Sequence, residues 1–308
     1  MWPKFAAKFE DGWLALVSHR ARLDLAHVIR PVGKRPQIAA FDSFRIEQNE
    51  VDALLRLAQG RDLKRHRCAT LLAENDYRLA QVDAPAVPAA ERVQALRWKL
   101  KDLVDFPVET AAIGVADIPA DNARQASVFA VAAAATVIGE RMKQFQDARL
   151  NLEAIDIPEM AVRNIATLFE EANRGLAFLL LSDDDSLLVI TYQGELYLSR
   201  RIEMTAEALS PDDLDRRMQM RERLALELQR TFDNFDRQFG FISVARLLVA
   251  TEKDSVGLTA ALGENLYIPV EAMDLAQVAD FDGIPELRLV ERQAQGLLAI
   301  GAALRTSA

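Results

Sequence analysis

The stretch GLAFLLLSDDDSLLVITYQGELYLSRRI, residues 175–202, decides the fold of this chain. Its three apolar runs are residues 175–181, 187–192 and 195–202, separated by a polar turn at 182–186 and by Gln193-Gly194. Short apolar runs between turn residues predict three strands joined by hairpins, a β-meander. The continuous run of Leu, Leu, Val and Ile at 187–190 is typical of a strand covered on both faces.

A shorter version of the same pattern lies near the N-terminus. Two apolar runs, residues 12–17 and 23–29, flank a turn at 18–22 that contains no glycine, and residues 37–46 predict a third strand. Two meanders that open two halves indicate a duplicated fold. In such folds each hairpin turn commonly faces a nucleotide phosphate.

Composition places the chain among ordinary soluble proteins. Its 308 residues suffice for about two domains, half of them are hydrophobic and 27% are charged. The net charge of -9 argues against nucleic acid as a partner, because nucleic-acid binding usually needs a basic face. A local basic run, residues 61–67, is interpreted as a solvated loop before a strand. The single cysteine, Cys68, excludes an internal disulfide and is expected in the core, in a reducing compartment.

Nothing in the sequence predicts secretion or membrane insertion. The start, MWPKFAAKFE, lacks the apolar segment of a signal peptide, and the longest apolar stretch, residues 126–138, is too short to cross a bilayer. We therefore expect a soluble, cytoplasmic protein. In an N-terminal stub, residues 1–11, Trp2, Phe5 and Phe9 are spaced for one helix face. This stub is either an amphipathic contact with a membrane or partner, or a frayed terminus packed on the body.

In the predicted first half, residues 12–157, a helix and a further strand come after the three strands. Asn49 is the expected N-cap of a helix over residues 50–59, and residues 66–72 predict the strand. An insertion, about residues 77–150, then interrupts this half. Its predicted elements are strands at 77–82, 109–118 and 127–133 and helices at 88–103 and 136–148, before a strand at 152–157 closes the half.

The predicted second half, residues 158–284, repeats this order after a helix at 158–173. Ser210 and Pro211 predict the start of a helix that runs to about residue 238. The apolar stripe of this helix, expected in the core, consists of Leu224, Leu228, Phe232, Phe235 and Phe239. Strands at 246–251 and 267–270 and a helix at 255–262 follow.

A C-terminal segment, residues 285–308, is predicted to form a helix that packs back on the first half. The residues expected to face inward are Leu289, Leu297, Ile300 and Leu304. Together these elements predict an α/β chain with two mixed sheets.

Several phrases of the sequence resemble PilM-type proteins of type IV pilus assembly. They are LRWKLKDLVDFPV at 96–108, residues 127–156 with GER at 139–141, AIDIPEM at 154–160 and IGAALR at 300–305. The order and spacing of these phrases, which together span most of the chain, carry the resemblance. Within the family, the divergent loops are most similar to those of the MshI-type members from mannose-sensitive haemagglutinin (MSHA) pilus systems.

The resemblance implies an actin-like ATPase fold. This is a duplicated, ribonuclease-H-like α/β fold with two mixed sheets flanked by helices and, here, an α/β insertion subdomain in the first half. The family works at the cytoplasmic face of the bacterial inner membrane and is peripheral to it through its partners. The partners implied are the cytoplasmic tail of a PilN-like membrane protein, MshJ-like in MSHA systems, and a pilus assembly ATPase.

Actin-like proteins hold phosphates with two hairpins that carry Asp-x-Gly, and a Gly-Gly turn contacts the adenosine. The glycine lets the backbone approach the phosphate, and the carboxylate organises Mg2+ and water. In this sequence Val17 and His19 stand where the Asp and Gly of the first loop are expected, on either side of Ser18.

The other two loops also depart from the family pattern. Ser182 and Asp183 take the second loop, with no glycine before Gly194, and Thr251 lies in the stretch that replaces the glycine pair. The aspartates at 183–185 place negative charge where a phosphate would lie. We interpret them as a solvated turn, although carboxylates also suit Mg2+ or Ca2+. His19, His27 and His66 show no metal-ligand spacing, so we expect no metal site.

These departures favour a non-catalytic scaffold, a pseudo-ATPase without bound cofactor, over a working enzyme. Two alternatives remain open: a Mg-ATP-binding ATPase or nucleotide-gated switch whose divergent loops rearrange, and a filament-forming actin-like protein. If ATP binds, the loop positions named above, Ser18, His19, Ser182, Asp183 and Thr251, would contact it.

The partner peptide is expected on the insertion, where an apolar edge can receive an extended segment. The residues predicted to line this groove are Trp98, Leu100, Leu103, Phe106, Val108 and Ile113.

Overall fold

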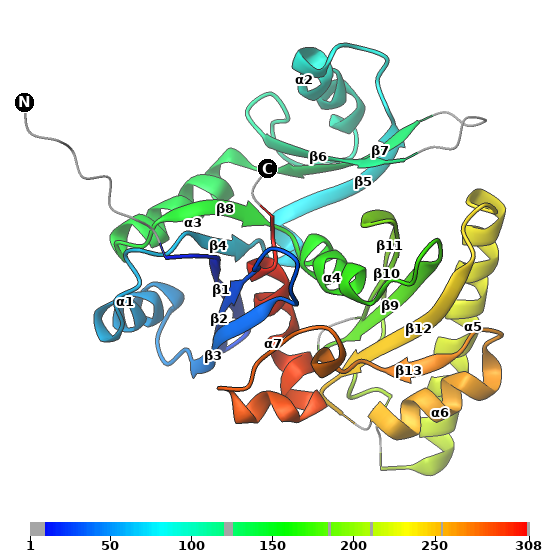
Figure 1. Ribbon diagram of the computed structural model, residues 1–308. Helices are drawn as coiled ribbons and strands as arrows, with labels where there is room; N and C mark the ends of the chain where they lie inside the picture. Colours follow the sequence, from blue (N-terminus) through cyan, green and yellow to red (C-terminus); the bar gives the residue numbers. More distant parts are fainter. Residues whose placement is uncertain (1–9, 120–125, 184–185, 210–211, 254, 307–308) are drawn as a thin grey trace, which may run out of the picture. The chain divides into compact units, whose positions relative to one another are not determined.

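The computed structural model describes residues 10–119, 126–183, 186–209, 212–253 and 255–306 (Figure 1). The chain divides into two compact units. The first comprises residues 1–30, 39–158 and 302–308, and the second comprises residues 31–38 and 159–301. The expected N-terminal stub therefore lies almost wholly outside the described residues. No helix among the described residues is long and apolar enough to cross a membrane.

The first unit is built on a five-stranded mixed sheet of order β3-β2-β1-β4-β8. Its strands are β1 (Trp13–His19), β2 (Arg22–Ile29), β3 (Gln37–Arg45), β4 (Cys68–Leu71) and β8 (Leu152–Asp156). β1 pairs antiparallel with β2 and parallel with β4, and β4 pairs parallel with β8. The predicted hairpin is therefore present, and the sheet is mixed, as predicted.

Two helices pack on each other and on this sheet: α1 (Glu50–Gly60) and α3 (Ala135–Asp147). The side chain of Asn49 accepts a hydrogen bond from the Asp52 N–H, which confirms the predicted N-cap. Leu16, Leu54 and Phe145 meet in the core between the strands and helices. Because α3 contributes to this core, it belongs to the body of the unit, whereas the predicted insertion, residues 77–150, included it.

The inserted part is a small antiparallel sheet of order β5-β7-β6, with β5 (Tyr77–Asp83), β6 (Ala112–Ile118) and β7 (Ser127–Ala133). A 3-10 turn, η1 (Glu74–Asp76), precedes it, and α2 (Ala89–Leu100) packs on β6 and β7. The predicted bounds of β7 are confirmed. The helix predicted over 88–103 ends earlier, at Leu100, and β6 begins three residues later than predicted, at Ala112.

The second unit repeats the sheet of the first. Its order is β11-β10-β9-β12-β13, with β9 (Gly175–Leu181), β10 (Ser186–Tyr192), β11 (Glu195–Ile202), β12 (Val244–Thr251) and β13 (Val270–Ala272). A meander again comes first, and its first strand, β9, pairs parallel with β12. Every residue of β9 is buried, as are the residues at 187–190, so the predicted two-sided burial of this hairpin is confirmed.

The helices of the second unit are α4 (Pro158–Ala166), α5 (Leu214–Gln238), α6 (Ser255–Asn265) and α7 (Val290–Ala303), where the last residues of α7 belong to the first unit. Short 3-10 turns are η2 (Thr167–Phe169), η3 (Leu275–Gln277) and η4 (Pro285–Arg288). The predicted apolar stripe of α5, from Leu224 to Phe239, is buried as expected.

Two boundaries predicted in this half are wrong, and so is the inward orientation predicted for Leu289 in the C-terminal segment. α5 begins at Leu214, because Asp213 caps it by accepting from the Arg216 N–H, while Ser210 and Pro211 lie outside the described residues. The strand predicted at 267–270 is instead β13, shifted toward the C-terminus. Leu289, predicted to face inward, is 59% exposed because it lies between η4 and α7.

The chain ends against the first unit. The Arg305 guanidinium lies over the Trp13 ring, 5.0 Å from its centroid, and pairs with Asp156 at 3.2 Å. Arg67 contacts the same ring at 4.9 Å. These contacts join the last turn of the chain to β1 and β8.

A close approach of α4 and α7 gives a stability prediction. A Cβ added at Gly301 would lie 2.2 Å from the carbonyl oxygen of Ala161, which belongs to the backbone and cannot move aside. We expect Gly301→Ala to lower the free energy of unfolding by about 1–3 kcal/mol, as overpacking does. Gly263→Ala is the matched control, because a Cβ there meets no atom within 4 Å. In urea unfolding, Gly263→Ala should be neutral or stabilising by up to about 1 kcal/mol. An unchanged urea midpoint for Gly301→Ala would contradict the close packing of α4 against α7.

Candidate functional site

At the first hairpin turn, where the resemblance would place a phosphate, polar side chains form hydrogen bonds with one another. Ser18, near the end of β1, donates its hydroxyl to Glu50 Oε1 at 2.6 Å. The Arg141 guanidinium pairs with the same carboxylate oxygen. Glu50 lies in the first turn of α1 and Arg141 lies on α3, so three elements meet at this carboxylate.

This arrangement is well protected from water. The side chains of Arg141 and Glu50 are only 12% and 22% exposed, and a carboxylate in the first turn of a helix is favoured by the helix dipole. Glu50 thus takes up both the hydroxyl of Ser18 and the charge of Arg141. A phosphate entering the turn would have to compete with this internal carboxylate for the same donors.

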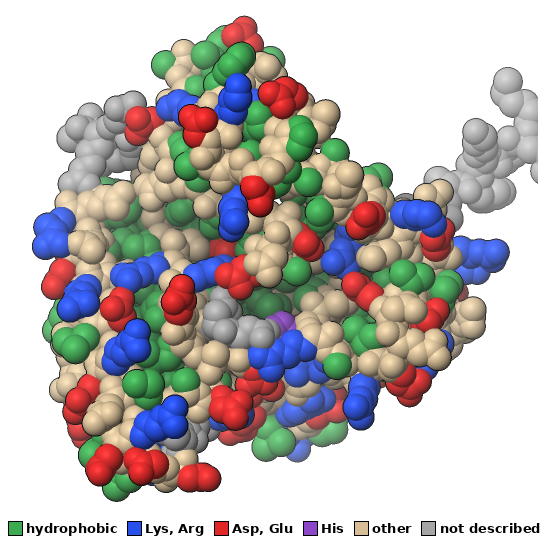
Figure 2. Space-filling model, turned by 180° about the vertical axis from the view of Figure 1, so that it is seen from behind, with side chains coloured by type: hydrophobic (Ala, Val, Ile, Leu, Met, Phe, Trp, Pro, Cys, Tyr) green, Lys and Arg blue, Asp and Glu red, His purple; other side chains and the backbone are tan. Residues whose placement is uncertain are grey.

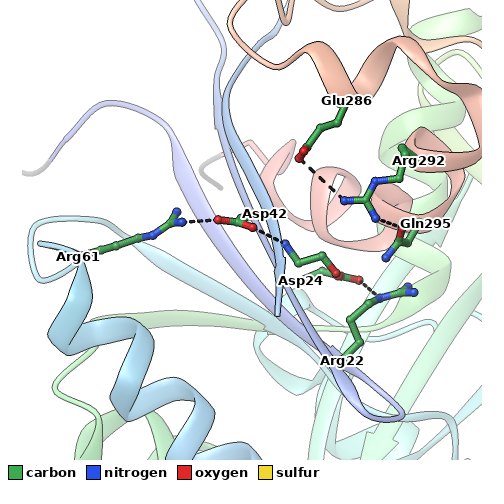
Figure 3. A network of polar contacts seen from close by, with 8 residues as sticks. Arg22, Asp24, Asp42, Arg61, Glu286, Arg292 and Gln295 are labelled. Carbon is green, nitrogen blue, oxygen red and sulfur yellow. Dashed lines mark hydrogen bonds and ion pairs between the residues drawn. The ribbon is translucent and has the colours of Figure 1, made fainter. Parts of the chain in front are cut away.

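His19 ends β1 and lies opposite Arg22 across a two-residue turn. The neighbouring polar group on β2 is Asp24, which is 4% exposed and accepts from Arg22 at 3.0 Å and from the Ser43 hydroxyl at 2.5 Å (Figure 3). Burial raises the pKa of Asp24, and the contacts with Ser43 and Arg22 oppose that rise. The hairpin is therefore held by polar contacts from its own unit.

The second hairpin and the end of β12 come together in the second unit. Leu181 and Thr251 are register partners, so Ser182 and Asp183 lie beside the loop that follows β12. The Thr251 hydroxyl donates to the carbonyl of Lys253 and accepts from its N–H, both at 3.2 Å. The three predicted loop positions of this half are therefore close to one another.

A lysine lies close to two carboxylates at this loop. Lys253 Nζ lies 3.9 Å from Asp183 and 4.0 Å from Glu207. These three side chains are 42%, 37% and 81% exposed, so the ion pairs are weak and screened by water. The other two aspartates of the predicted triplet lie outside the described residues, and the described residues contain no cluster of His, Cys, Asp or Glu suited to a metal.

Sequence reasoning missed a buried ion pair in the second unit. Glu159 on α4 is 2% exposed and accepts from Arg201 on β11 at 3.0 Å. Glu159 belongs to the phrase AIDIPEM, so the resemblance marked the segment but not the role of the carboxylate. Because an unpaired carboxylate in the core would be very unfavourable, Arg201 is needed to keep α4 on the sheet.

Of the residues predicted to line the groove of the insertion, some are exposed and the others are buried in the core of the small sheet. Trp98 and Leu103 are 72% and 49% exposed, whereas Leu100 and Val108 are buried in the core of the small sheet. Phe106 and Ile113 are partly buried and pack against that core. The surface available to a partner is therefore narrower than predicted and centres on Trp98.

A small hollow of about 120 Å3 adjoins Trp98. It is lined by Gln94, Arg97, Trp98, Lys101, Val108 and Glu109. Arg97 donates to the Val108 and Ala111 carbonyls, which fixes the chain after α2 in place. The hollow thus has a rigid wall, an exposed indole and two basic side chains.

Two further expectations concern Cys68 and the histidines. Cys68 is fully buried, which confirms it as a core residue, and burial raises the pKa of its thiol to about 12. His27 and His66 lie edge to face with ring centroids 4.8 Å apart, a contact that their sequence spacing did not reveal. Burial and His27 lower the pKa of His66.

The charge distribution offers no broad basic surface on the face shown in Figure 2. Lys and Arg side chains are interspersed there with Asp and Glu. This agrees with the acidic net charge of the chain.

The fold has clear relatives among solved structures. The PilM-PilN type IV pilus biogenesis complex contains a chain with a TM-score of 0.71 and 19% identity, matched over 95% of this chain and 98% of that one. The cytoplasmic domain of EpsL, an inner membrane component of the type II secretion system of Vibrio cholerae, has a TM-score of 0.52 and 12% identity over 96% and 97%.

A Bacteroides thetaiotaomicron protein with an actin-like ATPase fold and unknown function has a TM-score of 0.51 and 10% identity over 96% and 98%. No protein-family model and no curated protein matches the sequence. The structural likenesses confirm that this chain has the actin-like ATPase fold that the sequence predicts.

The carboxylate at the first hairpin gives a second stability prediction. Arg141→Ala leaves Glu50 shielded from water without its cation, so we expect a loss of about 1–3 kcal/mol in the free energy of unfolding. Lys143→Ala is the control on the same helix, because its pair with Asp147 is 71% and 47% exposed and contributes less than about 1 kcal/mol. Equal effects of the two variants in urea unfolding would contradict the role given to Glu50.

Proposed function

We propose that this protein is a cytoplasmic scaffold of a type IV pilus assembly platform, and that it binds the tail of a PilN-like inner-membrane protein without hydrolysing ATP. The observation that carries the proposal is the likeness to the PilM-PilN complex over 95% of the chain. The EpsL likeness supports a role at the cytoplasmic side of a membrane-embedded machine. The protein would be peripheral to the membrane through this partner.

The state of the loops supports the non-catalytic part of the proposal. Glu50 and Arg141 engage the first hairpin, and Lys253 neutralises part of the negative charge at the second. Neither described turn presents the glycine and free carboxylate that Mg-phosphate binding uses. The fold would then serve as a rigid support for protein contacts.

We propose that the pilus system is of the MSHA type and that this chain has the role of MshI. The cytoplasmic tail that it binds would then belong to an MshJ-like protein. The divergent loops of the sequence support this choice. A pilus assembly ATPase would be the further partner to which the platform is coupled.

Tail binding can be followed through Trp98, whose indole is largely exposed. A PilN-like cytoplasmic tail peptide should shift its fluorescence to shorter wavelength and bind in the micromolar range. Trp98→Ala should weaken the peptide's affinity, measured by calorimetry, by about tenfold, as expected for an aromatic anchor. Met142→Ala on α3 is the control and should leave the affinity unchanged, because Met142 is also an exposed apolar residue and does not line the hollow. Absence of binding at high micromolar peptide would refute the proposed function.

A further inference from the structure

A second pocket, larger than the hollow at Trp98, lies between the end of β3 and α1. Its volume is about 410 Å3, within the range of ligand-binding pockets. The lining residues are Phe44, Arg45, Glu47, Ala53, Arg56, Leu57, Gly60 and Arg61. None of its lining residues lines the hollow at Trp98.

The pocket combines an apolar floor with a basic rim. Ala53 and Leu57 are buried residues of α1, and the partly buried ring of Phe44 packs against the same core. Three arginines stand around this floor against two carboxylates, Glu47 in the lining and Asp42, which pairs with Arg61. In a chain of net charge -9, such a local excess of positive charge favours an anionic ligand.

Two of these arginines already form ion pairs with carboxylates of the same unit. Arg61 pairs with Asp42 (Figure 3). Its guanidinium also lies over the Phe44 ring, 5.3 Å from the ring centroid. Arg56 pairs with Glu47 at 2.7 Å. All four charged side chains are between 38% and 66% exposed, so these pairs are weak and exchangeable.

The backbone beside the pocket favours an extended peptide over a compact ligand. β3 is the edge strand of its sheet, and edge strands offer unpaired backbone groups to a further strand. Asp42 Oδ1 accepts from the Ser43 N–H at 2.9 Å while its other oxygen binds Arg61. A carboxylate bridging the strand edge and the basic rim is therefore already present within the protein.

We propose that this pocket binds an acidic, extended segment of a partner protein. An apolar side chain of the segment would rest on Phe44, Ala53 and Leu57. Its flanking carboxylates would take the places of Asp42 and Glu47 on Arg61 and Arg56, with Arg45 as a further cation on the rim. The inference does not rest on the proposed function, because it uses different residues on a different part of the first unit.

The test uses the full chain and a fluorescein-labelled peptide of sequence SDELEDS, followed by fluorescence anisotropy. We expect saturable binding that weakens steeply with added salt, since the contacts are ionic. The peptide SDESEDS, without the apolar side chain, should bind more weakly, and SKKLKKS should not bind. The double variant Arg45→Glu/Arg56→Glu should weaken SDELEDS binding by at least about tenfold.

Arg230→Glu is the matched control, because Arg230 is 70% exposed on α5 and also pairs with a glutamate. It should leave the affinity unchanged, and far-ultraviolet circular dichroism should show that all variants fold. Equal binding of the acidic and basic peptides, or equal binding by the double variant, would overturn the proposal. A third outcome would also overturn the proposal: SDELEDS fails to bind, while the wild-type chain sediments with phosphatidylserine vesicles and the double variant does not. The ligand of the pocket would then be a lipid surface.

Discussion

Both units depend on one parallel strand pair at the centre of each sheet, β1 with β4 and β9 with β12. Parallel pairing needs a long crossover between the strands, and it buries both faces of the sheet under helices. The apolar run that ends in Leu181 is therefore buried at every position of β9. The same pairing brings the loops at the carboxyl ends of the paired strands to one edge, which is where α/β sheets usually bind ligands.

At this edge, contacts within the protein hold both hairpins. At the first hairpin, Glu50 gathers the Ser18 hydroxyl and the Arg141 guanidinium into a shielded cluster. At the second, Lys253 lies between Asp183 and Glu207. These side chains lie in the loops where the resemblance would place phosphate and metal, which is why we propose that the protein does not use nucleotide. In the proposed scaffold role, the fold would present exposed surfaces such as the one at Trp98 to partners.

The sequence predicted the fold wherever the pattern was local. The meander and β7 were predicted from apolar runs and turn residues. The start of α1 was predicted from Asn49, a residue type that favours the N-cap position. Local signals failed where two candidates competed, as at the start of α5, where Asp213 rather than Ser210 provides the described cap. The site was less predictable, because its partners are distant in sequence. Glu50 and Arg141 lie 91 positions apart, and no periodicity or motif joins such a pair.

We propose that this actin-like fold works without nucleotide, and equilibrium dialysis of the intact chain against Mg-ATP measures this binding. We expect no saturable binding up to about millimolar nucleotide, because the two hairpin loops lack the glycine that lets the backbone approach a phosphate and Asp183 repels phosphate. Asp183→Lys should therefore not reduce the small amount of ATP retained. Micromolar binding to the wild-type chain that disappears in Asp183→Lys would contradict the account, since the aspartate would then be organising a metal-bound nucleotide.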